Sequence, residues 1–240
     1  MALLKTKNLR KTYGGRSVVC DLSFEVGKGE IVGLIGANGA GKTTAFYMAI
    51  GLIKPDSGQV ILNDVDVTKL PVHKRAKMGV GYLAQEPSVF SQLSVKDNLL
   101  CILETLQMRK KARMQRLKEL LAELNLTHLA DKKASTLSGG ERRRLEITRA
   151  LITNPSLLLL DEPFANVDPK TIADVRKMIQ HLTSKGISVL ITDHNAREIF
   201  AIAHRSYLMQ AGSVLAHGTT QDLVENSIVR EAYLGNDFRL

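Results

Sequence analysis

Hydrophobic and polar positions follow three successive patterns along the chain, and the first predicts strands. Residues 18–26 roughly alternate between apolar and polar side chains, which is typical of a strand with one buried face. The run 31–35 is almost continuously apolar, as expected for a strand buried on both faces. A Pro-Asp-Ser-Gly turn signal precedes a further strand at 58–62. The first part of the chain is therefore expected to be rich in β-structure.

The second pattern is helical and covers the middle of the chain. Apolar residues recur at helical spacing over 94–107 and again over about 111–124. In the second stretch the expected apolar face consists of Met114, Leu117, Leu121 and Leu124. Ser138, followed three residues later by Glu141, forms a capping box that predicts another helix through about residue 153.

In the third pattern strands and helices alternate. Strands are predicted at 157–160 and 187–191, with a helix between them from Asp168-Pro169 to Gly186 and a hairpin at 207–216. Such alternation indicates an α/β core with a mainly parallel sheet. Residues 1–85 and 154–240 are expected to form this core, and 86–153 an inserted helical subdomain.

Charge adds an uneven basic balance. The chain of 240 residues carries 33 Lys and Arg against 24 Asp and Glu, a formal net charge of +9 that favours anionic partners. Residues 105–118 contain six basic side chains and no acidic one: Arg109, Lys110, Lys111, Arg113, Arg116 and Lys118. The favoured interpretation of this stripe is a solvated helix face. Attraction to anionic lipid head groups is the alternative.

Several classes of protein are disfavoured by composition. No apolar run approaches the roughly 18 residues that span a bilayer, and the amino terminus does not have the pattern of a signal peptide. Cys20 and Cys101 stand apart without metal-ligand spacing, which predicts reduced thiols in a cytoplasmic protein. Aromatic residues make up 5% of the chain and Trp is absent, so a stacking platform for nucleic acid is not expected.

A phosphate-binding loop follows the strand at 31–35. The sequence Gly36-Ala37-Asn38-Gly39-Ala40-Gly41-Lys42-Thr43 matches G-x-x-x-x-G-K-[ST] between a predicted strand and a predicted helix. The glycines let backbone amides approach phosphates closely, while Lys42 would reach the β- and γ-phosphates and Thr43 would hold Mg²⁺. The chain is therefore expected to bind a nucleotide.

Polar residues follow two other buried strands. Asp161 ends the four-leucine run and would hold Mg²⁺, commonly through water. Glu162 is placed to polarise a water for attack on the γ-phosphate. His194 ends the strand at 187–191, at the edge where ligands collect in parallel sheets, and could donate a hydrogen bond to the γ-phosphate.

The segment Leu137-Ser138-Gly139-Gly140-Glu141 adds a second anion site, because two glycines at a capped helix start expose amide groups. Its place after a helical stretch and before the Asp-Glu strand end resembles the signature of ATP-binding-cassette (ABC) ATPases, and this resemblance covers essentially the whole chain. The resemblance implies a P-loop NTPase fold with a RecA-like parallel-sheet core, an N-terminal antiparallel β-subdomain and an inserted helical subdomain.

The same resemblance implies roles for individual residues. Tyr13 would stack on adenine, Gln85 would link Mg²⁺ and water to the helical subdomain, and the loop 165–168 would cross to an opposite protomer. Asn166 departs from the Gly or Leu that is common at its position. The implied nucleotide contacts are Tyr13, Gly36, Asn38, Gly39, Ala40, Gly41, Lys42, Thr43, Thr44, Ser138, Gly139 and Gly140. Lys42, Gln85, Glu162 and His194 would be catalytic, and Thr43, Gln85 and Asp161 would hold the metal.

Within the family the sequence is most similar to ATPases of bacterial lipopolysaccharide exporters. The resemblance rests on segments 82–86, 93–99, 138–144, 193–198 and above all the tail 233–240. It implies ATP and Mg²⁺ as ligands and a head-to-tail homodimer. It also implies that the chain lies in the cytoplasm, on the cytoplasmic face of the inner membrane, where it binds separate transmembrane subunits. Ser91 departs from the basic residue that the exporter family would lead us to expect.

Alternatives remain open. Branched-chain amino-acid importer ATPases share much of the pattern, and a soluble nucleic-acid- or ribosome-associated ATPase is a more distant possibility that the basic stripe could support. A non-catalytic scaffold is disfavoured because Asp161 and Glu162 are both present. Val89, Phe90 and Leu93 could anchor a membrane subunit's cytoplasmic helix, or could instead pack within the helical subdomain.

Overall fold

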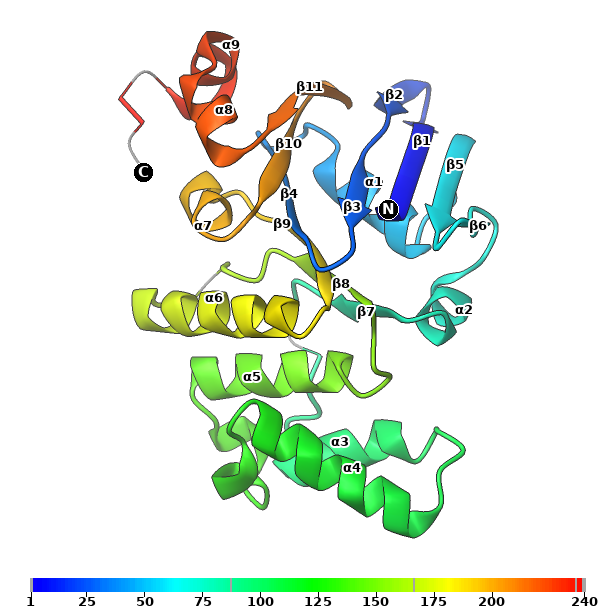
Figure 1. The fold of residues 1–240 in the computed structure, drawn as a ribbon, viewed down its shortest axis with the longest axis vertical. Helices are drawn as coiled ribbons and strands as arrows, with labels where there is room; N and C mark the ends of the chain where they lie inside the picture. Colours follow the sequence, from blue (N-terminus) through cyan, green and yellow to red (C-terminus); the bar gives the residue numbers. More distant parts are fainter. Residues whose placement is uncertain (1, 87, 166, 236, 239–240) are drawn as a thin grey trace.

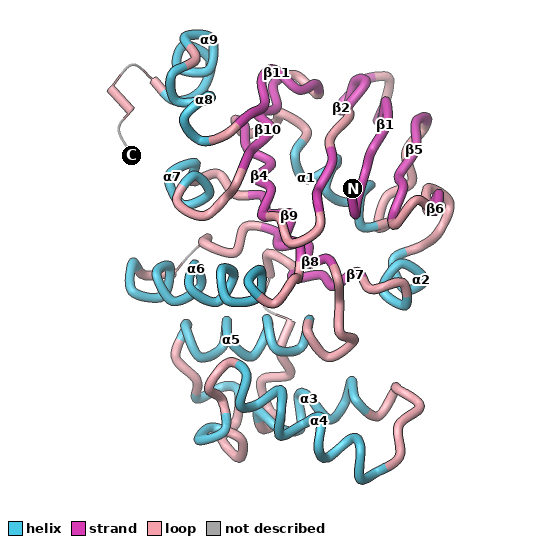
Figure 2. Tube along the Cα trace, in the orientation of Figure 1, coloured by secondary structure: helices cyan, strands magenta, loops and turns pink. Residues whose placement is uncertain are grey.

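The computed structural model describes residues 2–86, 88–165, 167–235 and 237–238. It contains two sheets and a helical region that extends from them (Figures 1 and 2). Pro87 of the predicted docking segment, Asn166 of the crossing loop and three residues of the tail (236, 239 and 240) lie outside the described residues. Within the described ranges, no helix combines the length and hydrophobicity needed to cross a membrane.

The main sheet is parallel except at one edge, as the sequence predicts. Its order is β11-β10-β4-β9-β8-β7, and β11 pairs antiparallel with β10 while the other neighbours are parallel. All residues of β4, β8 and β9 are buried, in agreement with their continuous apolar runs. The strand bounds are Ile31–Gly36 (β4), Val80–Leu83 (β7), Leu157–Asp161 (β8), Ser188–Thr192 (β9), Arg205–Gln210 (β10) and Ser213–Gly218 (β11).

The second sheet is antiparallel and comes from the amino-terminal part. The long strand β1 pairs with β2, β3 and β5, and β5 pairs with the short β6. The bounds are Ala2–Tyr13 (β1), Arg16–Leu22 (β2), Glu25–Gly27 (β3), Ser57–Leu62 (β5) and Val65–Asp66 (β6). The single strand expected over 18–26 is wrong in detail: the chain leaves β2 after Leu22, and the shorter β3 begins at Glu25.

The helix α1 (Lys42–Ile50) lies between the two sheets (Figure 1). Its buried residues Phe46, Met48 and Ile50 share one hydrophobic cluster with residues of both sheets. Because this helix starts at the phosphate-binding loop, the loop rests on a well-packed base. A short helix, α2 (Val72–Lys77), which the sequence pattern did not predict, leads into β7.

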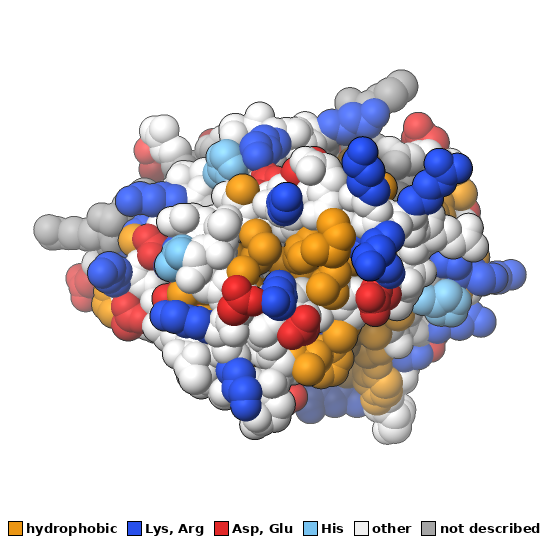
Figure 3. Space-filling view, turned by 90° about the horizontal axis from the view of Figure 1, so that it is seen from below, with side chains coloured by type: hydrophobic (Ala, Val, Ile, Leu, Met, Phe, Trp, Pro, Cys, Tyr) orange, Lys and Arg blue, Asp and Glu red, His pale blue; other side chains and the backbone are white. Residues whose placement is uncertain are grey.

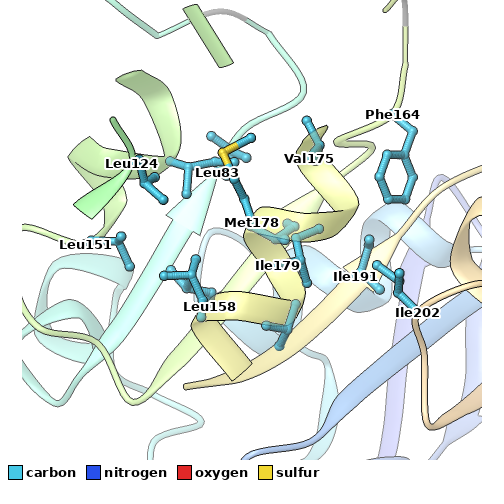
Figure 4. Packing of buried hydrophobic residues seen from close by; sticks show 14 of the residues in the cluster. Leu83, Leu124, Leu151, Leu158, Phe164, Val175, Met178, Ile179, Ile191 and Ile202 are labelled. Atoms are coloured by element: carbon cyan, nitrogen blue, oxygen red, sulfur yellow. The ribbon is translucent and has the colours of Figure 1, made fainter. Parts of the chain in front are cut away.

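The helical region consists of α3 (Val95–Leu103), α4 (Lys110–Glu123) and α5 (Gly139–Ala150), with two short 3₁₀ turns between α4 and α5. The helix α5 packs on α6 (Pro169–Ser184), which covers the main sheet. Leu124 and Leu151 therefore share a hydrophobic cluster with Met178 of α6 and Leu158 of β8 (Figure 4). The helical region and the sheet are joined by a continuous core.

Two predictions about α4 have different outcomes. Met114 was expected on the buried face but is 40% exposed, and Leu120 is buried in addition to Leu117 and Leu121. In the basic stripe, Arg113 lies 3.5 Å from Glu104, and Arg116 donates to the Leu151 carbonyl at 3.1 Å. The end of the molecule formed by the helical region carries basic, acidic and apolar side chains side by side (Figure 3). The mixture supports the interpretation as a solvated face.

Candidate nucleotide-binding site

The loops that carry the predicted chemistry leave the same edge of the main sheet. The phosphate-binding loop follows β4, Gln85 follows β7, Glu162 follows β8 and His194 follows β9. The four strands are parallel neighbours in the order β4-β9-β8-β7, so their carboxyl ends meet at this edge. Ligand sites in open parallel sheets form at such edges.

Two glycines of the phosphate-binding loop have no room for a side chain. A Cβ on Gly36 would lie 2.3 Å from the carbonyl oxygen of Met209, and a Cβ on Gly41 would lie 2.6 Å from that of Val18. Gly41 also has a left-handed φ of 96° and precedes the first residue of α1. The sequence pattern therefore reflects close backbone contacts. The first turn of α1 contains no acidic residue, which suits an anion site.

Lys42 projects back under this loop. Its side chain belongs to a residue that is only 7% exposed, and Nζ donates hydrogen bonds to the carbonyls of Gly36 at 2.7 Å and Ala37 at 3.0 Å. Burial lowers the pKa of Lys42, while the carboxylates of Glu162 and Asp193 raise it. Thr43 is exposed and Thr44 half-buried, so the Thr43 hydroxyl is accessible.

Asp161 is a buried carboxylate with an unpaired oxygen. The residue is 2% exposed at the end of β8, and its Oδ2 has no hydrogen-bond partner among the described residues. Burial, followed by the charges of the Glu162 and Asp193 carboxylates, raises the pKa of Asp161 to about 6, although a hydrogen bond with Tyr47 lowers it. An unpartnered buried carboxylate oxygen beside a phosphate-binding loop fits a divalent cation.

A cation held there would not need a cage of protein ligands. No group of three or more His, Cys, Asp or Glu side chains in the described part of the chain is arranged to hold a metal. Mg²⁺ is usually bound through one or two carboxylates, with substrate phosphates and waters completing its octahedron. One carboxylate from Asp161 and one hydroxyl from Thr43 are donors of that kind.

The structure brings Glu162, Gln85 and His194 together. Gln85 Nε2 donates to Glu162 Oε2 at 2.8 Å, and His194 Nδ1 lies 3.7 Å from the same oxygen. Glu162 has a left-handed φ of 45°, and its amide donates to the Thr192 carbonyl at 2.8 Å. A non-glycine residue held in this conformation is typical of functional sites, where the surrounding structure maintains the strain.

Comparison with known proteins places this arrangement in a family. The family model described as ABC transporter matches residues 19–165. The chain is 51% identical over 238 residues to the lipopolysaccharide export system ATP-binding protein LptB of Acidithiobacillus ferridurans, covering 99% of each chain. It is 50% identical over 241 residues to the protein of the same description from Escherichia coli K12, covering 100% of each. The chain belongs to the ABC transporter family.

Solved structures agree with this assignment. An ATP-binding cassette of an ABC transporter in its ADP conformation superposes with a TM-score of 0.89 and 29% identity, covering 98% of this chain and 100% of that one. A cassette described as the dimeric structure of a post-hydrolysis state bound to ADP and Pi has a TM-score of 0.78 and 25% identity, covering 90% and 98%. The predicted fold class is confirmed: this chain is an ABC ATPase.

The signature residues of this ABC ATPase lie away from its phosphate-binding loop. Ser138 caps α5, accepting from the Glu141 amide at 3.3 Å while Glu141 accepts from the Ser138 amide at 2.8 Å, so the predicted capping box is confirmed. A cavity of ≈ 190 Å³ beside Gly139 is lined by Gln85 and Val167 and by no residue of the phosphate-binding loop. Among the hydrogen bonds of the described residues, none joins Ser138, Gly139 or Gly140 to the phosphate-binding loop.

Tyr13 and the predicted docking residues lie in different settings. Tyr13 ends β1, is 46% exposed and has Lys11 Nζ at 5.4 Å from its ring centre. Phe90 is 52% exposed, and the guanidinium of Arg149 lies 5.1 Å from its ring centre. The Phe90 backbone is fixed by Asn98, whose side chain accepts from the Phe90 amide at 2.8 Å.

Val89 and Leu93 are half-buried, and Val89 packs against the core of the helical region. Of the three residues, Phe90 is the most exposed and therefore the most available to a partner. The burial of Val89 and Leu93 favours the alternative that these two side chains pack within the helical region.

Asp193 is a residue of the site that the sequence reasoning missed. It is buried, its Oδ1 accepts from the Asn195 amide at 2.9 Å, and its Oδ2 accepts from the Phe164 amide at 3.1 Å. Burial raises the pKa of Asp193, whereas these two amides lower it. The carboxylate therefore ties the loop after β8 to the loop after β9. An acidic residue directly after a buried strand was the available signal.

Tyr47 was also missed, because it lies within the helical pattern of α1. Its hydroxyl interacts with Asp161 and with Tyr82 of β7, and burial followed by the Asp161 charge raises the pKa of Tyr47. A tyrosine at this position orients the buried carboxylate. Nothing in local spacing relates residue 47 to residue 161.

Proposed function

We propose that this ABC ATPase powers lipopolysaccharide export from the bacterial inner membrane, as a head-to-tail homodimer bound to separate transmembrane subunits on the cytoplasmic face. The observation that carries the proposal is identity of about half the residues, over the whole length, to proteins described as lipopolysaccharide export system ATP-binding proteins. The geometry of the site supports the ATPase part independently.

The residues at the sheet edge divide the work of ATP hydrolysis. Backbone amides of the phosphate-binding loop and Lys42 bind and orient the phosphates, and Tyr13 stacks on the adenine. Asp161 and Thr43 would hold Mg²⁺, which neutralises charge on the β- and γ-phosphates when bound. Glu162 orients a water for attack in line with the γ-phosphate.

Gln85 and His194 position that step, because both side chains lie at the Glu162 carboxylate. Gln85 fixes one carboxylate oxygen of Glu162. His194 is placed to donate to the γ-phosphate. Gln85 also stands at the junction with the helical region, so a change at the γ-phosphate is transmitted to α3 and α5.

A second copy of the chain completes the site. Ser138 and Gly140 of the partner subunit would cap the γ-phosphate that rests on the phosphate-binding loop, and the reverse holds for the second ATP. ATP favours the closed dimer through contacts available only in that state. Loss of the γ-phosphate then releases the clamp, and this cycle of closure and reopening does the mechanical work.

Purification of the tagged chain from membranes tests the proposal. We expect two transmembrane subunits to co-purify, and the complex in proteoliposomes to release lipopolysaccharide to an acceptor in an ATP-dependent manner. The Glu162→Gln complex, which retains all subunits, is the matched control and should release none beyond one round. Co-purification of amino-acid importer subunits, or of nucleic acid, would contradict the assignment.

A further inference from the structure

The carboxyl-terminal segment of the chain reaches the nucleotide site. After β11 the chain forms α8 (Thr220–Glu225), α9 (Ser227–Val229) and a π-helical turn at Arg230–Leu234. These elements lie beside α7 (Ala196–Phe200), the helix that starts directly after His194 (Figure 1). The chemistry assigned to the nucleotide site gives this segment no role, although the tail contributes most to the resemblance to lipopolysaccharide-exporter ATPases.

The Tyr233 hydroxyl lies between two loops of the site. It donates to the His194 carbonyl at 3.4 Å. Burial raises the pKa of Tyr233, whereas the nearby Gly36 backbone amide lowers it. The hydroxyl thus hydrogen-bonds to the backbone of the histidine after β9 and lies close to the first residue of the phosphate-binding loop.

The ring of Tyr233 also fills space between these loops. It lines a cavity of ≈ 180 Å³ with residues 37–40 of the phosphate-binding loop, and a shallower hollow of ≈ 340 Å³ with residues 194–197. Phe238 holds the tail on α7: its ring packs edge-on against Phe200 at 6.1 Å, and the Arg197 guanidinium lies 5.4 Å from its centre.

The His194 side chain depends on its backbone for position. It is 59% exposed, with Nδ1 at 3.4 Å from Asp193 Oδ1 and 3.7 Å from Glu162 Oε2. An exposed imidazole at these distances is held less firmly than a buried one. A small shift of the backbone at residue 194 would move the imidazole by a comparable amount relative to the γ-phosphate position.

We propose that Tyr233 is a positioning residue for ATP hydrolysis, which sets His194 relative to the phosphate-binding loop and so lets the carboxyl-terminal segment control the rate of hydrolysis. The inference rests on the role of His194 in the proposed function. It assigns Tyr233 an effect on turnover and none on nucleotide binding, since the hydroxyl contacts backbone atoms rather than the ligand.

The substitution Tyr233→Phe tests this, because it removes the hydroxyl and keeps the ring. We expect kcat for ATP to fall about five-fold, the size of effect expected from one ordinary hydrogen bond, with KM within about two-fold of its original value. Tyr207→Phe is the matched control: its hydroxyl accepts from the Glu25 amide at 3.2 Å, away from the site, and kcat should stay unchanged. An unchanged kcat in Tyr233→Phe would overturn the proposal.

A double-mutant cycle with His194→Ala separates positioning from a general structural role. If Tyr233 acts through His194, then adding Tyr233→Phe to His194→Ala should change the residual single-turnover rate by less than about two-fold. A further five-fold loss in that background would overturn the positioning role and leave the proposed function standing. A normal rate in His194→Ala itself would contradict both.

Discussion

The two halves of the nucleotide site differ in how completely this chain builds them. Around the phosphate-binding loop, Lys42 and Asp161 are buried, and Gly36 and Gly41 have no room for a Cβ. Around the signature, Ser138 is exposed, and a Cβ on Gly139 would meet no atom within 4 Å. One half is fixed by its own fold, whereas the other is a capped helix start that faces solvent.

This difference fits the proposed homodimer, in which one chain binds ATP and a second chain is needed to hydrolyse it. The fixed half already has its backbone amides, Lys42 and its carboxylates in place, so binding requires little rearrangement. The open half offers unpaired amides at a helix start, which gain a ligand only when an anion is brought to them. In the proposed homodimer, closure would supply that anion from the fixed half of the other subunit.

The largest effect is expected in the fixed half. Glu162→Gln preserves the shape of the side chain and removes the charge that polarises water, so the steady-state ATPase rate should fall by at least about 100-fold. Nucleotide affinity, measured by titration, should remain within a few-fold. The variant with ATP should elute as a dimer in size-exclusion chromatography. Turnover close to the original rate would show that another group activates the water.

A smaller effect is expected in the open half. Ser138→Ala removes a helix cap, which costs about 1 kcal/mol of unfolding free energy, and also removes the hydroxyl offered to the other subunit's ATP. We expect the rate of hydrolysis to fall about ten-fold, in line with loss of a hydrogen bond to a charged group, with ATP affinity of the monomer unchanged.

Ser94→Ala is the matched control, because Ser94 caps α3 in the same region and accepts from the Asp97 amide at 3.1 Å. It should reduce the free energy of unfolding by a similar amount and leave the rate of hydrolysis unchanged. Equal losses of rate in both variants would mean that Ser138 acts through helix stability alone.

The sequence predicts the local patterns of both halves and misses residues that reach the fixed half from other elements, and the reason is physical. The phosphate-binding loop and the Asp161-Glu162 pair are local patterns next to buried strands, so spacing alone locates them. Asp193, Tyr47 and Tyr233 reach the site from other elements, and their contacts depend on how those elements pack. The break after Leu22 and the exposure of Met114 were missed for the same reason, since tertiary packing overrides periodicity.

The fixed half should also carry a cost in stability. Because the folded pKa of Asp161 is about 6, above the 3.8 of an aspartate in water, the folded chain binds this proton more tightly than the unfolded chain does. The group therefore destabilises the fold as pH rises from about 4 to 6, and the penalty is fully present at pH 7. In EDTA, Asp161→Asn should raise the free energy of unfolding by about 3 kcal/mol at pH 7 and by much less at pH 4. An equal gain at both pH values would mean that the carboxylate is not destabilised by burial.

The smallest effect on the isolated chain is expected at Phe90, in the proposed docking surface for membrane subunits. Phe90→Ala removes an exposed ring that packs on Arg149, so the ATPase rate in detergent-free buffer should stay within about two-fold of the original, as for most surface substitutions. Co-purification with transmembrane subunits should be lost, because exposed aromatic residues contribute strongly to interfaces. Met114→Ala, at another exposed apolar residue of the helical region, is the control and should keep the partners. If Phe90→Ala still co-purifies with the transmembrane subunits, Phe90 does not anchor them, and the docking surface lies elsewhere on the molecule.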